Sequence, residues 1–288
     1  MSPMPMLTSL ILEYTHLDGQ QLDKWFPNLQ VLNLVQVTGL QDPNIRLLNL
    51  KTCLWDVIDY LRSLTLITPN LTTFKFKSMK PAALHLEAPK LSQFYLDLYV
   101  REFAGALTVK KFENLKTLWL DVFYIGSRSS FSAFPITKTV ESLTLHSRYG
   151  SPTDSNLTLG KVFTVFPNVS SLCIKSGAWS ELEACFNRQG WEILDGRKGL
   201  KTIRAYLMSI DPLLTFSFVS CLLDQCVGLL EVSLFINADY PDYYDDDDDD
   251  DDASESFMSK CMARWPGLKW TWGEWSEFME DLNDPWYT

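Results

Sequence analysis

The stretch Phe26–Leu34, FPNLQVLNL, carries the pattern that predicts the fold. Leu29, Leu32 and Leu34 form an L-x-x-L-x-L frame directly after a Pro-Asn pair. In the L-x-L part, alternate side chains point to one face of a short strand. The Pro-Asn pair favours a turn before that strand. One such unit cannot bury its own apolar face, so the frame predicts that copies of it stack side by side.

The frame recurs ten times, with these apolar positions: Leu7, Leu10, Leu12; Leu29, Leu32, Leu34; Ile45, Leu48, Leu50; Leu71, Phe74, Phe76; Leu91, Phe94, Leu96; Leu115, Leu118, Leu120; Val140, Leu143, Leu145; Val169, Leu172, Ile174; Leu200, Ile203, Ala205; Leu229, Val232, Leu234. The steps between copies run from 16 residues (29 to 45) to 31 residues (169 to 200). Leucine-rich repeats have a period of roughly 20–29 residues. We therefore predict an α/β leucine-rich-repeat solenoid over residues 1–236, with a parallel β-sheet on its concave face and irregular loops and short helices on its convex face. The short step predicts a bare loop, and the longer steps leave room for a helix.

Two connectors carry helix signals. Ser180 and Glu183 form a capping-box pair ahead of apolar residues at helical spacing. Asp211-Pro212 predicts the start of a second helix, in which apolar residues recur every fourth position from Leu214 to Cys226.

The repeat pattern ends after Ile236. Residues 237–256 contain the run Asp245–Asp252 and are predicted to be a disordered acidic loop. Residues 257–288 hold five of the ten tryptophans and are predicted to cap the last repeat. A ligand-binding aromatic cage is the alternative for this tail.

Composition bounds the function. The formal charge is −11, but removing the eight aspartates leaves 25 basic against 28 acidic residues, or −3, which argues against a nucleic-acid partner. The sequence has no run of 18 apolar residues and no basic, apolar leader, so neither a membrane span nor a secretory signal is expected. The six cysteines are scattered, without a C-x-x-C pair, which favours a reducing compartment, cytoplasm or nucleus.

No constellation typical of an enzyme is found. His16, His85 and His146 are isolated, and neither a phosphate-binding nor a nucleophile motif is present. The Asp run lacks the alternation and the glycine of a calcium loop. We therefore expect no catalytic residues, no cofactor and no metal.

The candidate binding residues are those expected on the concave face. In each frame the middle residue of L-x-L and the residue just after the frame point away from the core. Aromatic and arginine side chains in such positions anchor protein interfaces. Tyr95 and Trp119 fall in adjacent repeats and should be neighbours; the alternative is a mixed, solvated face with Trp119 shielded by a loop. The predicted partner-binding residues are Lys75, Lys77, Tyr95, Asp97, Trp119, Asp121, His146, Lys175, Arg204 and Tyr206.

The openings F-P-N-L and A-P-K-L, and the closing stretch CMARWPGLKWTWG at Cys261–Gly273, resemble the repeat half of plant F-box/LRR-repeat proteins. The resemblance implies that an N-terminal F-box docks on the adaptor of a cullin-based ubiquitin ligase while the repeats hold a substrate. The first frame already starts at Leu7, so we expect no F-box here, and adaptor binding only if an F-box is supplied elsewhere.

The predicted function is a protein-interaction scaffold that holds a protein substrate on its concave face. One alternative is a small-molecule or hormone sensor, in which Lys75, Lys77, Lys175 and Arg204 would bind an anionic ligand. Another is a truncated relative without a ligase role.

Overall fold

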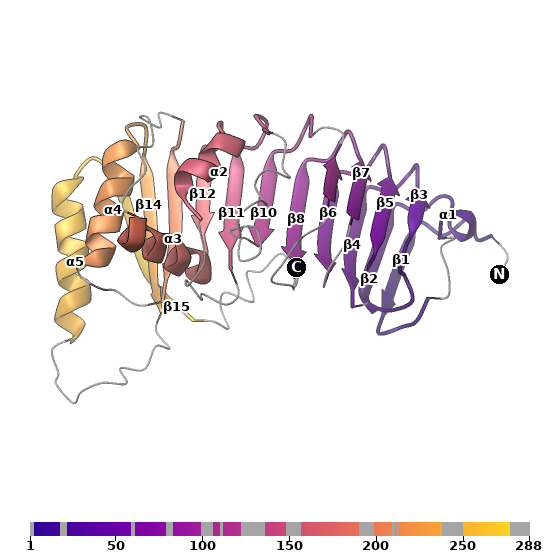
Figure 1. Ribbon diagram of the computed structural model, residues 1–288, viewed down its shortest axis with the longest axis horizontal. Coiled ribbons are helices and arrows are strands. Elements are labelled where there is room, and N and C mark those ends of the chain that lie inside the picture. Colours follow the sequence, from indigo (N-terminus) through magenta and orange to yellow (C-terminus); the bar gives the residue numbers. More distant parts are fainter. Residues whose placement is uncertain are drawn as a thin grey trace. The chain divides into compact units, whose positions relative to one another are not determined.

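The protein is described by a computed structural model (Figure 1), in which two compact units are distinguished. The first unit comprises Met1–Glu141 with Val165–Pro167, and the second comprises Ser142–Thr164 with Asn168–Thr288. The described residues are 3–17, 22–58, 61–78, 83–98, 106–109, 112–121, 136–147, 157–189, 199–208, 211, 213–237 and 250–276.

A hydrogen-bonded turn opens the repeats. The backbone N–H of Leu29 donates to the carbonyl of Phe26 at 3.2 Å, and Leu91 donates in the same way to Ala88 at 3.0 Å. Proline suits the second position of such a turn because its φ is already fixed near the required value. The predicted Pro-Asn turn is confirmed, and it starts each strand at the same place relative to its neighbour.

The strands that follow these turns form one parallel sheet in the first unit. Their order is β1-β2-β4-β6-β8-β10, and Figure 1 shows them running side by side. The frame residues alternate into the core, where Leu32, Leu34, Leu118 and Leu120 are fully buried. The strands are β1 (Ser9–Glu13), β2 (Val31–Val37), β4 (Thr52–Val57), β6 (Thr73–Ser78), β8 (Gln93–Leu98) and β10 (Thr117–Asp121).

One predicted frame, at Ile45, Leu48 and Leu50, is wrong. Ile45 lies in a different sheet, and Leu48 is 61% exposed. The frame instead begins at Leu50, which closes the opening turn, and continues with the buried Cys53 and Trp55 of β4. The steps from 29 to 50 and from 50 to 71 are then both 21 residues, and the 16-residue step disappears. The frame at Ile45 and the frame at Leu50 are both apolar, but only the frame at Leu50 keeps the inter-repeat hydrogen bonds in register.

A second parallel sheet, of order β3-β5-β7-β9, occupies the return segments of the first unit. Figure 1 shows β3, β5 and β7 as a layer separate from β2, β4 and β6. Leu64, Leu66, Leu84 and Leu86 alternate into the core from this layer. The sequence prediction of loops and short helices missed these strands, which are β3 (Asn44–Arg46), β5 (Ser63–Ile67), β7 (Ala83–Glu87) and β9 (Ala106–Val109); one four-residue helix, α1 (Leu22–Trp25), also belongs to this unit.

The second unit combines a parallel sheet of order β11-β12-β13-β14-β15 with longer helices in the return segments. Residues 38–51 connect β2 to β4, whereas residues 175–201 connect β12 to β13. Only the longer connection has room for a helix with its turns. The elements are β11 (Ser142–His146), α2 (Leu159–Val165), β12 (Ser171–Ile174), α3 (Ser176–Gln189), β13 (Thr202–Leu207), α4 (Leu214–Gln225), β14 (Glu231–Asn237), α5 (Asp250–Arg264) and β15 (Lys269–Trp275).

The two predicted helices exist, with one start corrected. α4 follows Asp211, whose carboxylate accepts hydrogen bonds from the backbone N–H groups of Leu213 and Leu214, both at 2.9 Å. α3 begins at Ser176 rather than near Ser180, which lies inside the helix and donates to the carbonyl of Ser176 at 3.2 Å. The capping-box pair at Ser180 therefore lies in the second turn of α3 and does not mark the start of that helix.

The C-terminal boundaries also differ from the prediction. α5 begins at Asp250, so residues 250–256 of the predicted disordered loop are helical. Acidic residues are favourable in the first turn of a helix. β15 then pairs with β14 in parallel register, after a turn in which Leu268 donates to Trp265, so the repeats continue beyond residue 236. Residues 238–249 and 277–288, the rest of the predicted loop and cap, lie outside the described residues.

Asparagine side chains link successive repeats of the first unit. The amide Nδ2 of Asn28 donates to the carbonyl of Pro5 at 2.9 Å, that of Asn70 to Leu48 at 2.8 Å, and that of Asn114 to Pro89 at 2.7 Å. Each asparagine follows the same turn position, so its amide reaches back to the equivalent loop of the preceding repeat.

Packing in the second unit includes one very close approach. A Cβ added at Gly177, in the first turn of α3, would lie 1.9 Å from the carbonyl oxygen of Ser147. The Ser147 hydroxyl donates to the buried Glu181 carboxylate at 2.5 Å. Gly177 therefore permits α3 to pack directly against the end of β11.

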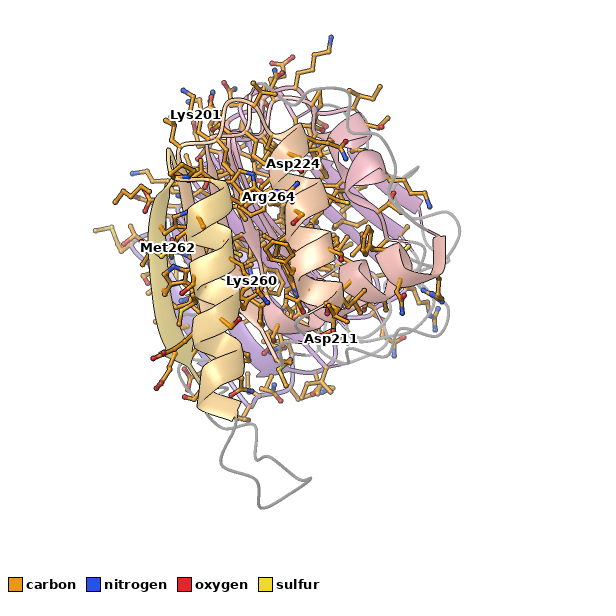
Figure 2. The ribbon with its side chains drawn as sticks, turned by 90° about the vertical axis from the view of Figure 1, so that its left-hand side faces the viewer. Lys201, Asp211, Asp224, Lys260, Met262 and Arg264 are labelled. Carbon is orange, nitrogen blue, oxygen red and sulfur yellow. The ribbon has the colours of Figure 1, made fainter. Side chains whose placement is uncertain are left out.

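Figure 2 shows α5 beside α4, where the guanidinium of Arg264 lies 2.5 Å from the carboxylate of Asp224.

Candidate partner-binding face

Each main sheet has a face that points away from the buried frame residues, called the front face below. In the first unit, Lys75 of β6 lies beside Tyr95 of β8, and Tyr95 lies beside Trp119 of β10. Lys77 lies beside Asp97 in the next row, and Asp121 follows in β10. The structure thus brings six of the ten predicted site residues into two adjacent rows.

Most of this cluster is buried. Trp119 is 4% exposed, Lys77 is 9% exposed, and Asp97 and Asp121 are fully buried. Tyr95 is half-buried, and burial raises the pKa of its hydroxyl. The Lys75 ammonium lies 5.9 Å from the Tyr95 ring centroid. The burial of Trp119 agrees with the shielded ring of the alternative, whereas the buried Asp97 and Asp121 do not agree with its mixed, solvated face.

Sequence reasoning missed one member of the buried row. Asp56 of β4 lies beside Lys77 in register, is 9% exposed, and accepts a hydrogen bond from Gln36 at 3.4 Å. Lys77 therefore lies between Asp56 and Asp97 on neighbouring strands, which are about 4.8 Å apart. The misplaced frame at Ile45 hid Asp56, because the correct frame through Cys53 and Trp55 puts it directly after the L-x-L part.

The other four predicted residues belong to the front face of the second unit. Cys173 of β12 lies beside Arg204 of β13. His146, Lys175 and Tyr206 each come directly after the last of these paired positions in β11, β12 and β13. Arg204 is exposed, Tyr206 and His146 are half-buried, and Lys175 is 6% exposed.

Two aromatic residues outside the prediction complete this cluster. The Phe235 ring stacks on Tyr206 with centroids 5.2 Å apart and an interplanar angle of 21°. Trp275 meets Tyr206 edge-on at 5.9 Å, and its indole Nε1 donates to the carbonyl of Leu207 at 3.0 Å. The Lys175 ammonium lies 4.5 Å from the Tyr206 centroid, and the Arg204 guanidinium lies 5.9 Å from that of Phe235. We call Lys175, Arg204, Tyr206, Phe235 and Trp275 the cation–aromatic cluster.

A sequence signal for the missed residues existed. Phe235 directly follows the frame that ends at Leu234, which is the position occupied by Tyr206 one repeat earlier. Trp275 was assigned to a cap, but it extends β15 beside Asn237 of β14. Treating W-P-G-L-K-W-T-W at 265–272 as a further repeat would have assigned Trp275 to a strand of the sheet instead of a cap.

Among the described residues, no group of three or more His, Cys, Asp or Glu side chains is placed to hold a metal ion. In the same part of the chain, none of the helices combines the length and the apolar character that crossing a bilayer requires.

The fold defines the class of protein. A parallel sheet built from one turn and strand per repeat, with return segments of strand or helix, is that of a leucine-rich-repeat protein, and the predicted α/β repeat fold is confirmed. The chain is 33% identical over 294 aligned residues to an F-box/LRR-repeat protein of Arabidopsis thaliana, an alignment that covers 98% of the chain. The similarity confirms that the repeats of this chain resemble those of the plant F-box/LRR-repeat family, as the sequence indicated.

The chain spans 62% of the length of that relative. No protein-family profile matches the sequence, and no solved structure matches it either.

Proposed function

We propose that this chain is the partner-recognition portion of an F-box/LRR-type subunit of a ubiquitin ligase, and that the front face of the second unit contacts the protein substrate. The observation that carries the proposal is the cation–aromatic cluster, in which exposed Arg204 and half-buried Tyr206 and Phe235 lie on adjacent strands. Aromatic and arginine side chains dominate the energy of protein interfaces. The similarity to an F-box/LRR-repeat protein supports protein partners.

The ligase half of the proposal rests on the relative. Its name includes an F-box, and this chain aligns with only part of it. An F-box supplied elsewhere would bind the ligase adaptor, while the repeats would select the substrate. Binding and ligase recruitment are therefore separable in experiment.

The test compares affinity capture and cross-linking by the full chain with those of two variants. Tyr206→Ala removes the ring that contacts Phe235, Trp275 and Lys175. Arg188→Ala is the control, because Arg188 is exposed in α3 and not on the front face. We expect a subset of partners that cross-links to β13 and β14 to be lost with Tyr206→Ala and kept with Arg188→Ala.

Identical partner sets for all three chains would refute the binding face. The ligase role has its own readout: partners lost with Tyr206→Ala should gain ubiquitin in cells in a manner that requires the ligase adaptor. If they bind but never gain ubiquitin, the ligase half is wrong and the binding face remains.

The small-molecule alternative is less well supported. It needs a cluster of accessible basic residues, but Lys77 is 9% exposed and Lys175 is 6% exposed. Thermal-shift assays with anionic metabolites would reveal a ligand that the protein-binding proposal does not require.

A further inference from the structure

We infer that β1 is an interface between two copies of this chain, which pair their β1 strands antiparallel about a two-fold axis at Ile11. Among the described residues, β1 pairs with β2 alone and forms one edge of the main sheet of the first unit. An edge strand presents a row of backbone N–H and C=O groups to another strand. This inference goes beyond the proposed function, because the proposed partner-binding face lies in the second unit and β1 in the first.

The backbone groups of three β1 residues point away from β2. The carbonyl of Thr8 accepts a hydrogen bond from the N–H of Gln30 at 2.7 Å. At the other end of β1, the N–H of Tyr14 donates to the carbonyl of Val35 at 2.9 Å. Alternate residues of a strand direct their backbone groups to the same side, so the even-numbered residues 8 to 14 all face β2. The residues that face the open edge are Ser9, Ile11 and Glu13.

The sequence of β1, Ser-Leu-Ile-Leu-Glu, has the same apolar pattern in both directions. With the axis at Ile11, this residue lies opposite Ile11 of the second copy. Leu10 then lies opposite Leu12, and Ser9 lies opposite Glu13. Directly opposed apolar side chains stabilise an antiparallel pair of strands. This register uses every backbone group on the open edge, whereas an axis at Glu13 would set two carboxylates against each other.

The first repeat leaves apolar surface that a second copy would cover. Leu10 and Leu12 are half-buried, although the residues beside them in β2, Leu32 and Leu34, are fully buried. Ile11 is 58% exposed. In the antiparallel pair, Leu10 of each copy contacts Leu12 of the other, so both frame residues of β1 gain the cover that those of β2 already have. Removing this apolar surface from water favours association.

The charge on β1 permits this approach. Glu13 is the charged residue of the strand, and it is exposed. In the proposed register the two Glu13 side chains lie at opposite ends of the paired region, about 14 Å apart along the strands. This distance exceeds the Debye length of about 8 Å at physiological ionic strength, so their mutual repulsion is largely screened.

The edge is held in place before a second copy arrives. The backbone N–H of Met4 donates to the carbonyl of Trp25 at 2.7 Å, and the Asn28 amide donates to the carbonyl of Pro5 at 2.9 Å. Pairing therefore orders little additional backbone. The interface is small, because β1 is five residues long, and we expect a dissociation constant on the order of 10–100 μM.

Sedimentation velocity of the full chain, from about 1 to 200 μM, tests the pairing. We expect monomers at the low end and dimers at the high end, without larger species, because a two-fold pair is closed. Ile11→Lys should weaken dimerisation at least tenfold, since it sets two ammonium groups against each other at the axis. Leu48→Lys is the matched control, because Leu48 is 61% exposed but lies outside β1, and this variant should dimerise like the native chain.

Charge exchange assigns the register. Ile11→Glu alone should also be monomeric, but an equal mixture of Ile11→Lys and Ile11→Glu should dimerise again, because opposite charges then meet at the axis. Thermal unfolding checks that both variants are folded, as the exposure of Ile11 leads us to expect. In the native chain, amide hydrogen exchange at Ser9, Ile11 and Glu13 should slow as concentration rises, while exchange at Leu10 and Leu12 should not change.

A native chain that stays monomeric at the highest concentration, or an Ile11→Lys variant that dimerises as well as the native chain, would overturn the inference. Oligomers that keep growing with concentration would overturn the closed two-fold pair. A mixture of the two charged variants that stays monomeric would overturn the register at Ile11. Tyr206→Ala should leave dimerisation unchanged, so failure of the proposed partner-binding face and failure of this interface are distinguishable.

Discussion

Replacing Trp119 with alanine distinguishes a binding anchor from a core residue. The sequence predicts a surface ring whose removal weakens partner capture without unfolding the chain. The structure instead leaves 4% of Trp119 exposed. A buried tryptophan removes roughly 150–250 Å² from water, worth about 4–6 kcal/mol as an upper bound at 25 cal/mol per Å². Measured losses for replacing a buried tryptophan with alanine are about 3–5 kcal/mol, and that is the range we expect for the free energy of unfolding.

The assay is urea unfolding followed by circular dichroism, beside thermal unfolding. A loss of this size lowers the melting temperature by roughly 6–20 °C in a domain of this size. Trp119→Phe is the control, because it keeps most of the apolar ring and should lose less than half as much. Leu54→Ala is a second control on the front face of β4, where Leu54 is only half-buried. If Trp119→Ala unfolds at the same urea concentration as the native chain and yet loses partners, the reasoning from burial is refuted.

Four further outcomes test the structure. Asn70→Ala should lower the free energy of unfolding by about 1 kcal/mol in urea titrations, since it removes the inter-repeat hydrogen bond from its amide. Gly177→Ala should cost about 2–3 kcal/mol or more in the same assay, while Gly267→Ala, whose Cβ meets nothing within 4 Å, should stay within about 0.5 kcal/mol of the native chain. Burial raises the pKa of the Glu183 carboxyl, so just above its ordinary pKa the folded state binds more protons than the unfolded state. The free energy of unfolding therefore falls in that range as pH rises. Glu183→Gln should abolish that fall in urea titrations between pH 4 and pH 8. Burial raises the pKa of Cys261 to about 12, so alkylation at pH 8, followed by mass spectrometry, should modify this thiol only after unfolding.

The sequence was sufficient for the main sheet because its apolar period and its turns are local signals. Leu32 and Leu34 alternate into the core as the L-x-L spelling requires. The second sheet of the first unit was missed although Ser63–Ile67 and Ala83–Glu87 have the same alternation. Alternation identifies a strand, but it does not say which of two sheets the strand joins. That choice depends on repeat length, since a 20- or 21-residue repeat leaves too few residues for a helix on the return.

The candidate site was predicted in part. Position in the repeat correctly placed Lys175, Arg204 and Tyr206 on one face, because strand register follows from the frame. Exposure could not be predicted in this way, since Trp119 and Arg204 are both the middle residue of their L-x-L frames, yet Trp119 is buried and Arg204 is exposed. What covers a side chain depends on segments distant in sequence, and the frame carries no information about them.

The charges on the two front faces suggest different roles for the two units. In the first unit, Asp56, Lys77, Asp97 and Asp121 lie at successive positions of β4, β6, β8 and β10, and each is at most 9% exposed. Burying a charged side chain costs free energy, and an oppositely charged neighbour recovers only part of that cost. Such a row therefore adds little to the free energy of unfolding and serves to fix which strands pair. Lys77 between two aspartates suits that structural role. In the second unit, Arg204 lies beside the stacked rings, and its side chain stays exposed to solvent instead of being buried in the fold. A charge that remains in contact with solvent can exchange water for a polar group of a partner, and for this reason we propose that partner recognition belongs to the second unit.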